Sequence, residues 1–370
     1  MSTETASLLP RRRYIDWTRG IAVLIMVQAH TLDAWTRPGD RSSMAFGYLM
    51  LLGGFAAPLF LWLAGVGLAL SAERVLDRTG HRSEATEAIV RRGAEIFILA
   101  FLFRLQAFII SPGSSPVTLF RVDVLNVMGP AVAVAGLVWS VSAGPRRAAL
   151  ACGIVATGIA MVTPIVRNAG WVGSLPIWTQ WYLRPSGEHT TFTMLPWAAF
   201  VFAGAAYGSV LALSRDQRAE RRLLSGLTLA GVVTLLVGFY TATRPSIYEA
   251  SSFWTSSPTY FAVRVGVLML ALALFYWASS VRSWLPQFFN VLEKFGRNSL
   301  FIYWIHVELV YGYTTWVFHR RLPLWGTATA YVIFCGVMYG AILARERVMG
   351  AWRSGRTQKS ASTGPATAQA

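Results

Sequence analysis

Long apolar segments alternate with short polar ones over most of this chain. Ten of the apolar segments are long enough to cross a bilayer, since about 20 helical residues span the hydrocarbon core. They lie at about residues 14–35, 44–71, 91–110, 121–142, 148–166, 194–213, 223–241, 259–280, 299–317 and 324–344. The pattern therefore predicts an all-α, polytopic integral membrane helix bundle with about ten transmembrane helices and both termini on one side.

The charge distribution supports this class and orients the bundle. Hydrophobic residues make up 54% of the chain and charged residues only 14%, which is too little charge for a soluble domain of 370 residues. The net charge of +16 does not indicate a nucleic-acid partner, because the basic residues form short clusters between apolar segments. Of the 33 Lys and Arg residues, 22 fall on the face that carries the termini and 8 on the other face. By the positive-inside rule, both termini are expected in the cytoplasm.

The chain divides into three parts by composition. Residues 1–13 are predicted to be a cytoplasmic arm, residues 14–345 a transmembrane domain, and residues 346–370 a polar, disordered cytoplasmic tail. Two long outward loops, 167–193 and 242–258, are rich in Trp and Tyr. Such residues are typical of the aromatic belt at a membrane interface, and they would equally suit a platform on which an acceptor such as a sugar ring stacks.

Small residues also recur at helical spacing. Gly204–Gly208 and Gly336–Gly340 are G-x-x-x-G pairs, which favour close packing of neighbouring membrane helices. Both pairs are therefore expected at helix–helix contacts.

Ionisable side chains inside a span are costly and usually face a bundle interior or a cavity. The first span contains Arg19 and His30, which are eleven residues apart and hence roughly 16 Å apart along one helix face. Asp33 follows one turn later and could hold one ring nitrogen of His30, leaving the other as a base. The alternative is that Asp33 lies at the outer membrane interface and simply caps or solvates the end of the helix. His306 lies in the ninth span and is expected roughly 10 Å into the membrane, at a different depth from His30.

Arginines supply a candidate anion site. Arg91 and Arg92 lie at the cytoplasmic start of the third span, and Arg19 and Arg104 lie deeper. A guanidinium group suits phosphate because it binds two oxygens at once. For Arg91 and Arg92 the alternative is membrane topology alone. Arg264 is the third arginine inside a span.

A second group of candidate site residues joins these arginines: Arg104, Asp123, Asn298, His306 and Glu308. The sequence has two cysteines, both in apolar segments, and it contains no nucleophile elbow, P-loop or metal-spaced Cys/His cluster. No metal site is therefore predicted.

Several motifs, in order along the chain, resemble a family of membrane enzymes. The first span reads Asp16-Trp17-x-Arg19-Gly20-Ile21-Ala22, through Met26, and then His30-x-x-Asp33. It resembles the first helix of bacterial transmembrane acyltransferases related to heparan-α-glucosaminide N-acetyltransferase. The spacing of Arg19 and His30 is also that of the wider acyltransferase-3 group. Three further segments are similar to that pattern: 57–66, 121–129 and 295–306.

The resemblance implies an enzyme of the bacterial inner membrane that moves an acyl group, typically acetyl, from cytoplasmic acyl-CoA. The acceptor would be a hydroxyl or amine of a glycan or similar compound at the outer face. Acyl-CoA would be a co-substrate, and no permanently bound cofactor is expected. The lysosomal glucosaminide enzymes carry an active-site His in the loop after the first helix, whereas the loop 36–43 has none here. The expected base is therefore His30, oriented by Asp33, and Arg19, Arg91 and Arg92 are expected to bind the phosphates of acyl-CoA.

A transporter for an anionic solute is the alternative function, with the buried arginines as its binding site. Internal repeats and interrupted helices favour transport, and the sequence indicates neither. The acceptor, the oligomeric state and the group that stabilises the oxyanion stay open.

Overall fold

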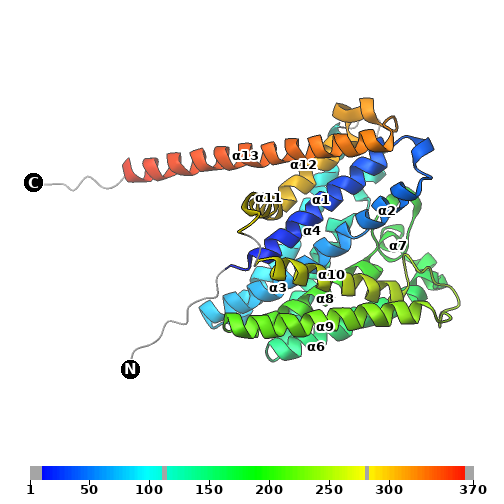
Figure 1. Cartoon of the computed structure of the whole chain (residues 1–370). Helices are drawn as coiled ribbons and strands as arrows, with labels where there is room; N and C mark the ends of the chain where they lie inside the picture. The colour runs from blue at the N-terminus through cyan, green and yellow to red at the C-terminus, as the bar shows by residue number, and fades with distance from the viewer. Residues whose placement is uncertain (1–10, 111–114, 280–282, 363–370) are drawn as a thin grey trace, which may run out of the picture.

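The computed structural model describes residues 11–110, 115–279 and 283–362, and in this part of the chain it is a bundle of α-helices (Figure 1). The start of α1 and the end of α13 lie on the same side of the bundle (Figure 1). The helices are α1 Arg13–Trp35, α2 Met44–Gly53, α3 Ala56–Thr79, α4 Arg82–Ile110, α5 Val124–Val141, α6 Pro145–Asn168, α7 Ile177–Leu183, α8 Met194–Leu211, α9 Gln217–Ala242, α10 Pro258–Ala278, α11 Pro286–Arg297, α12 Ser299–Tyr311 and α13 Leu324–Ser362.

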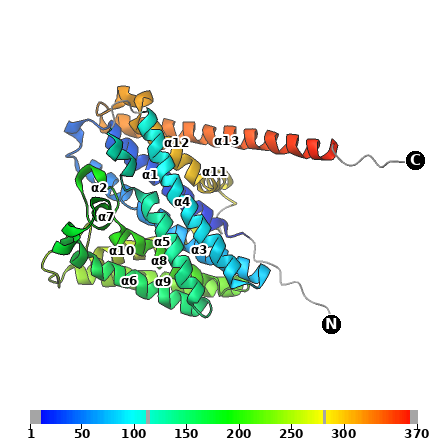
Figure 2. The same cartoon turned by 180° about the vertical axis from the view of Figure 1, so that it is seen from behind.

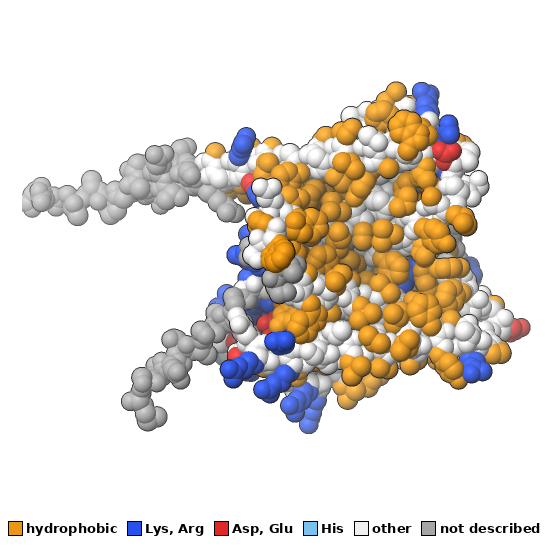
Figure 3. All heavy atoms as spheres, in the orientation of Figure 1, with side chains coloured by type: hydrophobic (Ala, Val, Ile, Leu, Met, Phe, Trp, Pro, Cys, Tyr) orange, Lys and Arg blue, Asp and Glu red, His pale blue; other side chains and the backbone are white. Residues whose placement is uncertain are grey.

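The ten predicted spans correspond to helices in this architecture. Among the described residues, eight helical segments are long and apolar enough to cross a membrane. The other two predicted spans are α1, which carries several charges, and α12, which has only 13 residues. Hydrophobic side chains cover the middle of the molecular surface, and Lys and Arg side chains gather toward its two ends (Figure 3). The chain is therefore an all-α, multi-pass membrane protein. We call the end that holds the start of α1 the arginine-rich face, and the other end the opposite face.

Three boundaries differ from the sequence predictions. The predicted span 44–71 is two helices, because α2 ends at Gly53 and α3 starts at Ala56. The predicted span 299–317 is helical only to Tyr311 and continues as a 3-10 segment, Tyr313–Phe318. The predicted disordered tail from residue 346 is also wrong as far as Ser362, since α13 continues to that residue. Arg, which favours helix, recurs where α13 leaves the apolar segment.

Close glycine contacts hold the helices together. Gly93 of α4 and Gly129 of α5 face each other, and a Cβ atom on either would lie 2.7 Å from the carbonyl oxygen of the other. These two helices run side by side (Figure 2). Gly204 and Gly208 of α8 pack in the same way on the backbone of α3, which confirms the packing role predicted for that pair. The prediction for Gly336–Gly340 is wrong for the described part of the chain, where no atom of another helix lies within 4 Å of a Cβ built at either glycine.

The two ends of α1 are fixed by different contacts. At the opposite face, the Arg37 N–H donates to the Leu322 carbonyl (2.8 Å), and the Leu324 N–H at the start of α13 donates to Oδ2 of Asp40 (2.8 Å). That backbone hydrogen bond, together with Arg37, holds the pKa of Asp40 below its usual range. At the arginine-rich face, Arg12 Nε donates to Glu220 Oε1 at 2.7 Å, and the Tyr14 hydroxyl donates to the same oxygen at 2.6 Å.

The contact with Glu220 predicts a stability effect. The side chains of Arg12 and Glu220 are 9% and 10% exposed, so Glu220→Ala leaves a buried guanidinium group without its counter-ion. Loss of one partner of a buried ion pair costs about 3–5 kcal/mol. We expect a clearly lower thermal midpoint in detergent, measured by intrinsic tryptophan fluorescence. Glu249→Ala, in an exposed loop, is the control and should leave the midpoint unchanged. Equal midpoints for both variants would contradict this account of the α1–α9 contact.

Candidate functional site

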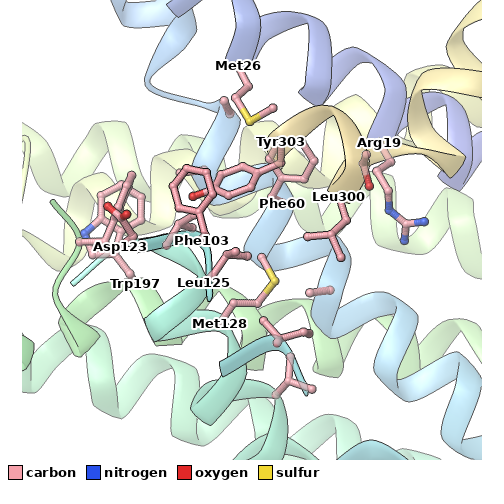
Figure 4. A pocket seen from close by; sticks show the side chains of 18 of the residues that line it. Arg19, Met26, Phe60, Phe103, Asp123, Leu125, Met128, Trp197, Leu300 and Tyr303 are labelled. Carbon is pink, nitrogen blue, oxygen red and sulfur yellow. The ribbon is translucent and has the colours of Figure 1, made fainter. Parts of the chain in front are cut away.

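A cavity of about 1030 Å³ runs through the bundle between α1, α3, α4, α5, α10 and α12. Figure 4 shows its length: Arg19 lies at one end of the view, and Asp123 and Trp197 lie together at the other. Arg19 and His30 both line it, as their spacing on one face of α1 predicts. The cavity reaches Arg92 toward the arginine-rich face and Thr191 toward the opposite face. It could therefore receive molecules from two directions.

Two histidines from distant parts of the chain meet beside this cavity. Nδ1 of His30 lies 3.2 Å from Nε2 of His306, and the rings are stacked with centroids 5.0 Å apart. His306 is fully buried, and its Nδ1 lies 2.7 Å from the carbonyl oxygen of Ile302. His30 lines the cavity, whereas His306 is behind it.

These contacts assign the protons on both rings. A carbonyl oxygen only accepts, so Nδ1 of His306 carries a proton, and in the neutral ring its Nε2 is then an acceptor. Nδ1 of His30 must then be the donor of the 3.2 Å contact. In the neutral ring, Nε2 of His30 is consequently unprotonated. This arrangement prepares His30 to accept a proton at Nε2.

The predicted contact between Asp33 and His30 is wrong. Oδ2 of Asp33 accepts a hydrogen bond from the Tyr311 hydroxyl at 2.9 Å, and Oδ1 lies 3.7 Å from Nη1 of Arg41. The Tyr311 ring packs edge-on against His30, with centroids 5.6 Å apart. His306 rather than Asp33 holds the ring nitrogen of His30, because Asp33 is at the rim of the cavity, where its side chain is 51% exposed.

The predicted difference in depth between the two histidines is also wrong. It assumed that the helix of His306 starts at the membrane surface. Instead, α12 follows α11, and Gly296 at the end of α11 packs directly on the backbone of Asp16 and Gly20 in α1. Ten residues further along each helix, at a rise of about 1.5 Å per residue, His306 reaches the level of His30.

Three arginines line the end of the cavity near the arginine-rich face: Arg19, Arg92 and Arg297. Nη1 of Arg19 lies 3.6 Å from Oδ1 of Asp16, and Nη1 of Arg92 lies 3.1 Å from Oε2 of Glu95. Arg91 does not line the cavity; its side chain is 71% exposed. Consecutive residues of a helix point about 100° apart, and here Arg92 lines the cavity while Arg91 is turned toward the exposed side. Arg91 is thus not part of the site.

The remaining predicted residues have separate positions. Arg104 and Asp123 form an ion pair, and both line the cavity. Glu308 also lines it, and its Oε1 has no hydrogen-bond partner among the described residues. Asn298 joins α11 to α12, and its Oδ1 accepts a hydrogen bond from Arg345, so it acts in packing outside the cavity. Within the described part of the chain, no group of three or more His, Cys, Asp or Glu side chains could hold a metal ion.

Sequence reasoning missed several residues of this cavity. Tyr311 and Arg297 gave no signal, because an aromatic residue near a span end and a basic residue before a span are both common in membrane proteins. Arg264 did give one, since it is an arginine inside a span, but it was not assigned to the site.

Comparison with known protein families gives one result. A family model described as an acyltransferase domain matches residues 12–344, which is most of the chain. No curated protein matches. The match extends from the start of α1 into α13 and so includes the whole cavity.

The proton assignment can be tested directly. In protein labelled with ¹⁵N-histidine, His30 and His306 should both show the shifts of a neutral ring protonated at Nδ1. His306→Ala removes the acceptor, so the Nδ1-protonated form of His30 should no longer dominate. His319→Ala, in which a histidine outside the cavity is replaced, should leave the His30 signals unchanged. A His30 ring protonated at Nε2 in the wild type would refute the assignment.

Proposed function

Because the chain belongs to the acyltransferase-3 family of membrane acyltransferases, we propose that it moves an acyl group, acetyl in the simplest case, from acyl-CoA to an acceptor. The acceptor is a hydroxyl or amine of a glycan or similar compound. The observation that carries the proposal is the contact of His306 with Nδ1 of His30, which leaves Nε2 of His30 as the acceptor in a cavity that reaches toward both faces. The arginine-rich face is the cytoplasmic one, as expected in a bacterial inner membrane.

Acyl-CoA binds at the arginine-rich end of the cavity. Its phosphates are matched by the three guanidinium groups of Arg19, Arg92 and Arg297, which favour anions and can bind two oxygens at once. Arg19 and His30 are roughly 16 Å apart along α1. The pantetheine arm extends along the cavity over this distance and brings the thioester to His30.

The acceptor enters from the opposite face and meets the thioester at His30. Nε2 of His30 takes the proton of the acceptor hydroxyl, while the oxygen of that hydroxyl attacks the thioester carbonyl carbon. The carbon–sulfur bond then breaks, and the thiolate of CoA takes the proton back from Nε2. The products are the acylated acceptor and CoA, and His30 is neutral again.

His306 is the positioning residue of this scheme. Its Nε2 accepts a hydrogen bond from Nδ1–H of His30. This hydrogen bond persists in both charge states of the His30 ring, because Nδ1 remains a donor after Nε2 is protonated. The pair thereby fixes which nitrogen faces the cavity. A misplaced or rotated ring would present Nδ1–H, which cannot accept a proton.

One structural feature favours the alternative function. The break between α2 and α3 at Gly53–Gly54 lines the cavity, and interrupted helices are common at transport sites. A transporter for an anionic solute would move it across proteoliposomes without acyl-CoA and without consuming a thioester. Solute uptake of that kind, with no acyl transfer, would replace the acyltransferase proposal.

The two histidines predict different losses of activity. Loss of a general base costs about 10²–10⁴-fold in rate, so His30→Ala should nearly abolish acyl transfer while acetyl-CoA still binds. His306→Ala should lower kcat about 10-fold to 100-fold, the usual cost of losing a group that orients a functional histidine. His306→Gln keeps an acceptor oxygen near the lost Nε2 and should recover part of this loss.

The measurement is release of CoA thiol and labelling of membrane acceptors from ¹⁴C-acetyl-CoA in vesicles. A purely structural role of His306 would lower kcat for the Ala and Gln variants alike. If His306→Ala abolishes transfer and His30→Ala does not, the base is on α12 and the scheme is wrong.

Adjacent arginines on α4 give a matched test of donor binding. Arg92 lines the cavity and Arg91 does not, and both lie within 4.0 Å of Glu95. A hydrogen bond between charged groups contributes about 1.5–3 kcal/mol, so Arg92→Ala should weaken acetyl-CoA binding at least about 10-fold. Arg91→Ala should bind as the wild type does. Calorimetric titration in nanodiscs measures both, and equal affinities for the two variants would remove Arg92 from the donor site.

A further inference from the structure

One charged group in the cavity has no role in the scheme above. Arg264 of α10 lines the cavity six residues after the start of its helix, hence roughly 9 Å below the opposite face. Its guanidinium group lies 4.2 Å from the ring centre of Tyr260 and 5.5 Å from that of Trp197. The Nε of Arg264 has no hydrogen-bond partner among the described residues.

Arg264 differs from the other arginines inside the spans. Arg19 pairs with Asp16, and Arg104 pairs with Asp123. The ion pairs found in the described part of the chain do not include Arg264, so no described carboxylate lies within 4.0 Å of it. Aromatic rings stabilise a cation but do not neutralise it. An uncompensated cation inside a membrane is costly, and such residues usually serve a ligand or an ion.

The break between α2 and α3 links Arg264 to the base. A Cβ atom on Gly53 would lie 2.7 Å from Cβ of Ala29, the residue before His30. A Cβ atom on Gly54 would lie 3.9 Å from Nη2 of Arg264. Both glycines line the cavity beside these two residues, and neither carries a side chain that would project into it.

The position of Arg264 also separates it from the donor site. The guanidinium groups assigned to the phosphates of acyl-CoA lie at the arginine-rich end, whereas Arg264 lies with Trp197 at the end where Asp123 is found (Figure 4). Thr191, Phe192 and Arg121 line the same end. A molecule that enters from the opposite face meets Arg264 before or as it meets His30.

We propose that Arg264 binds an anionic group of the acceptor, so that the enzyme selects acidic acceptors that carry a carboxylate or a phosphate. The acidic group binds the guanidinium fork of Arg264, while a hydroxyl or amine elsewhere on the same molecule reaches Nε2 of His30. This assignment rests on the proposed acyltransferase function, and it makes Arg264 a specificity-determining residue.

The test measures binding and needs no knowledge of the natural acceptor. Protein in nanodiscs is titrated at constant ionic strength with glucuronate, glucose 1-phosphate and the neutral methyl α-glucoside, and calorimetry records the affinity. At least one acidic probe should bind 10-fold or more tightly than the neutral one. The preferred acid distinguishes a carboxylate from a phosphate group. A wild-type protein that binds neither acid better than methyl α-glucoside overturns the proposal.

Three variants locate the binding. Arg264→Met should lose the preference for the acid, and Arg264→Lys should keep part of it, because Lys retains the charge but not the fork. Arg244→Met is the matched control, since Arg244 lies over the Tyr240 ring at 4.6 Å in a similar cation–π contact but does not line this cavity. Its affinities should equal those of the wild type. If Arg264→Met does not fold, the Arg264→Lys variant decides. An unchanged preference of Arg264→Lys for the acidic probe, together with loss of that preference in Arg244→Met, would place the anion site elsewhere.

A parallel titration with acetyl-CoA separates this proposal from the acyltransferase function. Wild type and Arg264→Met should bind acetyl-CoA equally, and acetyl-CoA should not displace the acidic probe. If acid probes bind through Arg264 but acetyl-CoA does not bind at all, the acyltransferase proposal fails and the anion site stands. If acetyl-CoA binds and reacts but Arg264→Met keeps the wild-type acid preference, the anion site fails and the acyltransferase proposal stands.

Discussion

The backbone contact between α1 and α11 sets the geometry on which the site depends. Gly20 packs against the carbonyl of Leu292, and Gly296 packs against the carbonyl of Asp16, so neither position has room for a Cβ atom. This close approach fixes the height at which α12 starts, and with it the height of His306 in α12. A bulkier residue at either glycine would separate the helices and move the two imidazole rings out of hydrogen-bond distance. The proton-accepting group of the cavity is therefore a consequence of glycine packing some 15 Å away, by helical rise.

The chemistry of the pair suits its surroundings. A carboxylate buried beside His30 would bring a negative charge into a region of low dielectric, where an unpaired charge is costly. With both rings neutral, the chain from His30 to His306 to the Ile302 carbonyl is fully hydrogen-bonded without a charged group. Charge develops on the rings only when Nε2 of His30 takes a proton. The hydrogen bond from Nδ1 of His30 to His306 strengthens as that charge develops. It therefore favours the transition state over the ground state, and this lowers the activation barrier. Asp33 remains at the rim, bonded to Tyr311, where water can solvate it.

The parts of this architecture that depend on local sequence were predictable, and the parts that depend on contacts between distant segments were not. The lengths of the apolar segments predicted helical structure at each of the ten proposed spans, and the eleven-residue spacing of Arg19 and His30 predicted that both line one cavity. The contact of His30 with His306 joins residues 276 positions apart. It depends on α11, an amphipathic helix that the pattern of apolar segments does not predict. The depth of a residue in a span cannot be counted from a helix end whose own position is unknown. Arg91 and Arg92 were also indistinguishable in the sequence, because the helix face that turns to the cavity is set by contacts with other helices. Only Arg92 lines the cavity.

The distribution of buried charge connects these observations to function. Two of the three arginines within spans, Arg19 and Arg104, pair with carboxylates of the protein. These ion pairs offset much of the free energy of burying the two guanidinium groups. Arg264 is held by aromatic rings, which orient a guanidinium group but leave its charge available. Gly53 and Gly54, at the break between α2 and α3, line the same cavity as Arg264 and His30 and carry no side chain that would project into it. An acceptor with an acidic group would supply the missing counter-charge, and its binding free energy would then place the nucleophile at the base. In this cavity, the span arginine without a carboxylate partner among the described residues is the one best suited to select the substrate.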